Sequence, residues 1–132
     1  INPRLIVISE TLEHLAKPSS TIIDIKNYCE NKDMYLYASF PRETGSTGFL
    51  KFVLRLLSGR NLHKGFSYNI KYFLWVIGML KDLRETKSFY ADHDGFNDKE
   101  LLIFFTQLFS KKDVFVKKGF STIHILIKFS AT

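Results

Sequence analysis

Leu5-Ile6-Val7-Ile8, near the start of the chain, decides the fold class, because a continuous apolar run rich in β-branched residues is typical of a strand buried on both faces of a parallel sheet. Pro18-Ser19-Ser20 then predicts the start of a helix, with proline in its first turn and serine as a candidate N-cap. Met34 to Phe40 predicts a second strand, which Pro41 ends. Strand, helix and strand in this order form a βαβ unit, so the predicted fold class is α/β.

The middle of the chain predicts helices. Arg42 to Gly48 is rich in Gly, Ser and Thr, and we expect a flexible link there. Apolar residues then recur at helical spacing over 49–57 and over Tyr68 to Leu83. The second of these segments is apolar around much of its circumference, so it should pack on both sides. It is interpreted as a core helix, a substrate lid or a homodimer helix.

The last third predicts one more helix and a hairpin. Asp98 is a plausible cap for a helix whose apolar stripe is Leu101, Leu102, Phe105, Leu108 and Phe109. Val114-Phe115-Val116, a turn at Gly119, and the alternating segment Ile123 to Phe129 follow. We expect these two strands to form an antiparallel hairpin that is added to the sheet.

Composition narrows the class of protein. A chain of 132 residues with 45% hydrophobic and 24% charged residues predicts one soluble globular domain, residues 1–132. The net charge of +6 permits an anionic partner, although Lys111-Lys112 and Lys117-Lys118 are better interpreted as a solvated hairpin face than as a nucleic-acid contact.

Cys29 is the single cysteine, which excludes a disulfide framework and favours a reducing compartment, the cytoplasm. Tyr72 to Leu80 is about half the ~20 residues that span a bilayer, so no membrane span is expected.

Three polar residues follow the first strand at helical spacing. Glu10, Glu13 and His14 stand at i, i+3 and i+4, so one helical turn would place them on the same face. Ligands of open α/β sheets bind beyond the carboxyl ends of the strands, where these residues lie. Two carboxylates and an imidazole could bind Mg²⁺ or exchange a proton with a substrate. A solvated polar cap on the next element is the alternative.

Four segments together resemble the second half of the class I S-adenosylmethionine-dependent methyltransferases, with their Rossmann-like sheet. Residues 6–15 with Pro18 are similar to the stretch after that family's fourth strand, and Tyr35 to Pro41 to its fifth strand. Asp92 to Phe96 resembles the segment before its last helix, and Lys118-Gly119-Phe120 the approach to its closing hairpin. Residues from about 46 to 88 would be a helical insert. The Glu-x-x-Glu-His pattern is particularly like that of ubiquinone-biosynthesis O-methyltransferases and small-RNA 2′-O-methyltransferases.

This resemblance implies S-adenosylmethionine as cofactor, with Ser9 and Glu10 near it. It also implies Glu13, His14 and His93 as catalytic residues, and a Mg²⁺ ion held by Glu10, Glu13, His14 and His93. Such a metal would bind the acceptor hydroxyl, lower its pKa and orient it toward the methyl group. In many other relatives, the residues that match His14 or Glu13 act without metal, as a general base or as a structural partner.

The match lacks the family's best-known element. There is no Gly-rich loop after a first strand and no acidic residue after a second, because Gly45 and Gly48 follow the strand that resembles the fifth. We therefore expect the C-terminal portion of a methyltransferase-like domain, which alone should not bind the cofactor strongly.

Three hypotheses of function follow. The leading one is O-methylation of a small-molecule hydroxyl. An RNA 2′-O-methyltransferase is the second, and it predicts RNA binding that weakens steeply with salt. The third is a non-catalytic interaction module that uses the helix over Tyr68 to Leu83 as its partner surface.

Overall fold

A four-stranded mixed sheet organises the part of the chain that the computed structural model describes, residues 4–80, 83 and 95–130. Its strands stand in the order β1 (Leu5–Ser9), β2 (Met34–Pro41), β4 (Thr122–Phe129) and β3 (Val114–Lys118). β1 and β2 are parallel, whereas β4 runs antiparallel to both of its neighbours. The predicted α/β class, the parallel pair and the added C-terminal hairpin are therefore confirmed.

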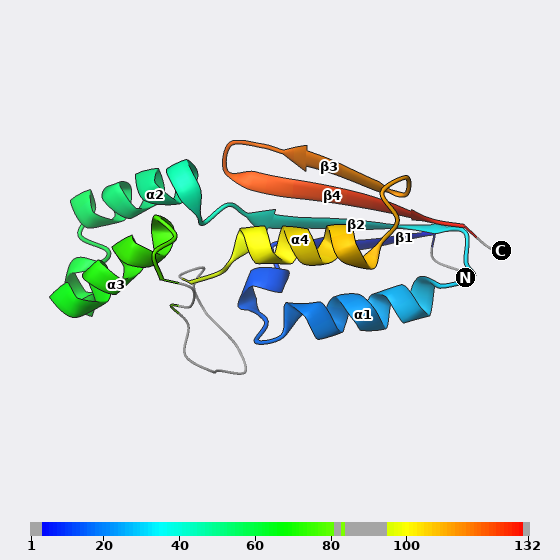
Figure 1. The fold of residues 1–132 in the computed structure, drawn as a ribbon, viewed down its shortest axis with the longest axis horizontal. Coiled ribbons are helices and arrows are strands. Elements are labelled where there is room, and N and C mark those ends of the chain that lie inside the picture. The colour runs from blue at the N-terminus through cyan, green and yellow to red at the C-terminus, as the bar shows by residue number, and fades with distance from the viewer. Residues whose placement is uncertain (1–3, 81–82, 84–94, 131–132) are drawn as a thin grey trace.

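Two helices cover one face of this sheet. α1 (Pro18–Cys29) connects the parallel strands, and α4 (Asp98–Leu108) precedes the hairpin; Figure 1 shows both helices on the same side. The predicted apolar stripe of α4 packs inward. Together with α1 and the inward side chains of the strands, it forms a core of fully or almost fully buried residues, which includes Ile22, Leu36, Phe40, Leu101, Phe105, Phe109 and Ile125.

The other face of the sheet is open among the described residues. Along β1, Ile6 and Ile8 pack on the core, but Leu5 is 52% and Val7 58% exposed. The prediction that this strand is buried on both faces is therefore wrong for the described structure, because α1 and α4 both lie on one side. Parallel strands are usually covered on both faces, so β1 is an unusual edge strand.

The segment after β2 is ordered by tertiary contacts. Glu43, Thr44, Thr47 and Gly48 are all buried, and α2 (Gly45–Leu57) begins within the predicted flexible link. That prediction is wrong because contacts with distant parts of the chain outweigh the weak helix preference of Gly, Ser and Thr. After η2 (Leu62–Lys64), the chain returns as α3 (Phe66–Val76).

α2 and α3 pack against each other beyond the end of the sheet at which β2 finishes (Figure 1). Their shared core contains Phe52, Tyr72, Trp75 and Val76. α3 ends earlier than the predicted helix, because Gly78 adopts a φ of 84°, which a right-handed helix does not allow. α3 also packs on one side only: Phe66 is 81% and Ile70 43% exposed.

The single cysteine has the structural role that its position predicts. Cys29 is completely buried at the end of α1. Burial raises the pKa of its thiol, and the charge of Lys32 lowers it by a smaller amount. The thiol therefore stays protonated near neutral pH. None of the helices in the described ranges is long and apolar enough to cross a membrane.

Candidate functional site

The candidate site lies at the carboxyl ends of β1 and β2, which share one edge because the strands are parallel. Ser9 and Ser39 are register partners, and their Oγ atoms are 2.9 Å apart. The Glu10 amide extends the pairing by donating to the Ser39 carbonyl at 3.1 Å. Glu10 then adopts a φ of 49°, an uncommon left-handed conformation that turns the chain out of the sheet.

A short 3₁₀ turn, η1 (Leu12–His14), follows this change of direction. Leu12 packs in the core, and Glu13 beside it is also 0% exposed. Oε1 of Glu13 lies 3.9 Å from Nε2 of His14, whose side chain is 23% exposed. This distance exceeds that of a hydrogen bond. A carboxyl group and an imidazole that lie side by side are groups that general acid–base catalysis uses.

Of the predicted cofactor, catalytic and metal residues, the structure brings Glu13 and His14 together. Glu10 does not join them on one helical turn, because its left-handed backbone precedes η1, and its side chain is exposed. Within the ranges that the structure describes, no three His, Cys, Asp or Glu side chains are grouped so that they could hold a metal ion. His93 lies outside the described residues, so the four-residue Mg²⁺ site stays a prediction.

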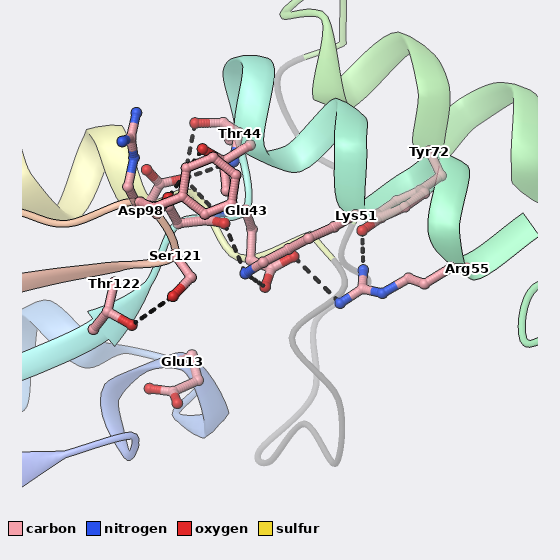
Figure 2. A network of polar contacts seen from close by, with 12 residues as sticks. Glu13, Glu43, Thr44, Lys51, Arg55, Tyr72, Asp98, Ser121 and Thr122 are labelled. Carbon is pink, nitrogen blue, oxygen red and sulfur yellow. Dashed lines mark hydrogen bonds and ion pairs between the residues drawn. The ribbon is translucent and has the colours of Figure 1, made fainter. Parts of the chain in front are cut away.

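A buried ion-pair network just beyond β2 is a feature that the sequence analysis missed. Glu43 is 0% exposed, and Lys51 Nζ donates to its Oε1 at 2.9 Å and to the Arg42 carbonyl, also at 2.9 Å. Arg55 Nη2 lies 3.3 Å from the other carboxylate oxygen, and its Nη1 bonds to the hydroxyl of Tyr72. Figure 2 shows Glu43 between the two cations, with Glu13 apart from them on η1. The network ties α2 and α3 to the site edge of the sheet.

Asp98 holds the same junction from the other side. Its Oδ1 accepts from the amides of Glu43 and Thr44 at 3.1 and 2.9 Å, and from the Thr44 hydroxyl at 2.8 Å. The sequence predicted Asp98 as a helix cap, but Asn97 caps α4 by accepting from the Glu100 amide at 3.1 Å. The sequence shows Glu43 shortly after a predicted strand and Asp98 at the start of a predicted helix. Spacing alone does not predict that these two residues, 55 positions apart, are in contact.

A cavity of about 390 Å³ lies next to η1, between the first turns of α1 and α4. Its walls are partly apolar, from Leu15, Phe96 and Phe104, and partly polar, from Lys17 and Glu100. A cavity of this size and mixed lining suits a small organic molecule. Its wall residue Leu15 directly follows His14 in the chain, but Glu13 and His14 are not among the wall residues.

The two remaining histidines contribute no further site in the described structure. Nδ1 of His124 is 2.8 Å from the Tyr37 hydroxyl across the sheet. The side chain of His63 lies outside the described part.

No protein-family model, curated protein or solved structure matches this chain. The function is therefore proposed from the site together with the resemblance of the sequence.

Proposed function

We propose that this chain forms the acceptor side of an S-adenosylmethionine-dependent methyltransferase that methylates a hydroxyl of a small molecule. The observation that carries the proposal is the Glu13–His14 pair, which lies at the carboxyl edge of a parallel strand pair. The next residue in the chain, Leu15, is part of the wall of a cavity of about 390 Å³. The antiparallel hairpin added beside β2 supports the proposal, because the resemblance implies that arrangement for the second half of the fold.

The residues have distinct roles in this reaction. S-adenosylmethionine, when bound, supplies an electrophilic methyl group. His14 accepts the proton of the acceptor hydroxyl, and the buried Glu13 carboxylate stabilises the resulting imidazolium from 3.9 Å. The cavity walls orient the acceptor, and orientation carries much of the rate of a direct displacement. The described carboxylates and histidine do not by themselves form a metal site, so no step is assigned to a metal.

The open edge and face of the sheet are consistent with a larger domain. The sequence contains no Gly-x-Gly loop, so residues that hold the methionine and ribose ends of the cofactor have to come from outside these 132 residues. Within the described residues β1 pairs with β2 alone, and Leu5 and Val7 are more than half exposed. Further strands beside β1 and helices over its open face would bury both side chains.

Binding of S-adenosylmethionine to the complete natural polypeptide that carries this sequence tests the proposal. Isothermal titration should give a dissociation constant of about 1–100 μM. Ser9→Tyr should weaken binding at least about tenfold, because the ring would occupy the space at the end of β1 where the cofactor is expected. Ser20→Tyr is the matched control on the exposed surface of α1 and should leave the affinity unchanged. No heat of binding at about 1 mM cofactor would contradict the proposal.

A further inference from the structure

α3 presents a straight apolar stripe to solvent. Phe66, Ile70, Phe73 and Ile77 follow one another at helical spacing, and they are 81%, 43%, 36% and 45% exposed. Tyr72 and Trp75 of the same helix form the core with α2, and Phe73 also contacts Phe49 and Phe52 of α2. A helix that is already packed on one side does not need a second apolar stripe for its own stability.

α2 carries exposed apolar side chains as well. Leu50, Leu54 and Leu57 are 44%, 56% and 79% exposed and lie three and four residues apart on one helix. Leu62, which is 68% exposed, lies in the connection between the two helices and shares an apolar groove with Phe66. We call the exposed apolar residues of 45–80 the α2–α3 surface. Exposed apolar side chains that gather on two neighbouring helices mark an interaction site.

The charge of the same segment is one-sided. None of the 13 acidic residues of the chain falls within residues 45–80, although an even distribution would place about three or four there. The segment carries five basic residues: Lys51, Arg55, Arg60, Lys64 and Lys71. Lys51 and Arg55 bind Glu43, which lies just before α2, whereas Arg60 and Lys71 are exposed. A segment that exposes apolar side chains and cations and contains no acidic residue is complementary to a surface that is apolar beneath and anionic above.

We infer that the α2–α3 surface docks on an anionic lipid bilayer. Its Phe and Leu side chains would lie among the acyl chains, and its cations would lie at the headgroups. α2 and α3 have 13 and 11 residues, which suits helices that lie in the interface rather than cross it. A second copy of the chain fits less well, because a two-fold interface would bring the same cations together without an acid from either segment.

Docking would also bring the candidate site close to the membrane. Glu43 binds Lys51 and Arg55 and so fixes α2 and α3 to the edge of the sheet that carries the carboxyl ends of β1 and β2 (Figures 1 and 2). That edge would then lie next to the membrane-bound helices.

Co-sedimentation of the complete chain with vesicles tests this inference. Vesicles of phosphatidylcholine with about 30% phosphatidylglycerol should bind the protein at least about tenfold more tightly than phosphatidylcholine alone, and about 0.5 M salt should weaken the binding. The double variant Leu57→Ser, Phe66→Ser should bind at least about tenfold less, because both side chains are about 80% exposed and contribute apolar area to the membrane rather than to the fold. Circular dichroism verifies that the variant is folded.

Matched controls separate this surface from general stickiness. Phe115→Ser removes a 61% exposed phenylalanine from the sheet and should leave vesicle binding unchanged. Arg60→Glu with Lys71→Glu should reduce binding to anionic vesicles at least about tenfold, whereas Lys111→Glu with Lys112→Glu should have little effect. Equal binding of the Leu57/Phe66 variant, or of neutral and anionic vesicles, would overturn the inference. So would a salt-resistant homodimer, seen by analytical ultracentrifugation, that this variant dissociates.

Discussion

Phe105→Ala should lower the free energy of unfolding by about 3–5 kcal/mol, a large part of the ~5–15 kcal/mol that stabilises a typical domain. Phe105 is 0% exposed in the middle of α4. Its ring stacks on Phe40 of β2 at 6.2 Å between centroids and on Phe109 at 6.1 Å. The truncation removes apolar burial and leaves a cavity between the helix and the sheet, and rigid neighbours on both sides limit its collapse.

Urea denaturation monitored by circular dichroism measures this loss. Ile103→Ala is the matched control, because Ile103 lies on the same helix and is 54% exposed. We expect the control to change the free energy of unfolding by less than about 0.5–1 kcal/mol. A cost below about 1 kcal/mol for Phe105→Ala would mean that α4 does not pack on the sheet as described.

Gly48→Ala should destabilise the protein by about 3 kcal/mol, although the same change in an ordinary helix stabilises by up to about 1 kcal/mol. Gly48 is buried in the first turns of α2. An added methyl group would overlap the carbonyl oxygen of Glu43 and lie 2.6 Å from its carbonyl carbon. These are backbone atoms, so relief requires the start of α2 to move away from the end of β2. That movement would disturb the bonds of Asp98 to Glu43 and Thr44.

Thermal unfolding of Gly48→Ala and of Ser46→Ala separates the close approach from helix preference. Ser46 is exposed two residues earlier in α2, and its replacement should shift the free energy by no more than about 0.5 kcal/mol. A neutral or stabilising effect of Gly48→Ala would contradict the tight junction between β2 and α2.

The strands and helices with a strong apolar period could be predicted from the sequence. β2, α4 and the C-terminal hairpin lie where the apolar patterns placed them, and α4 and β4 each bury one regular face. The start of α2 could not be predicted, since it depends on Asp98, 54 residues from Thr44. The open face of β1 was also missed, because a continuous apolar run does not show how many of its faces are covered.

The candidate site was predicted in part. Spacing drew attention to Glu13 and His14, and the structure places them 3.9 Å apart. It did not predict that Glu10 turns away, because a left-handed φ at a glutamate has no sequence signal. The buried position of Glu43 was missed because it depends on contacts with Lys51 and Arg55, which lie 8 and 12 positions further along the chain.

The most direct measurement is a crystal structure of the complete natural polypeptide with S-adenosylhomocysteine. We expect the sulfur atom above the carboxyl ends of β1 and β2, within about 8 Å of the His14 imidazole, which leaves room for one acceptor hydroxyl between them. A cofactor bound at another edge of the sheet, or one whose sulfur lies too far from Glu13 and His14 for a bridging hydroxyl, would contradict the proposed methyltransferase site.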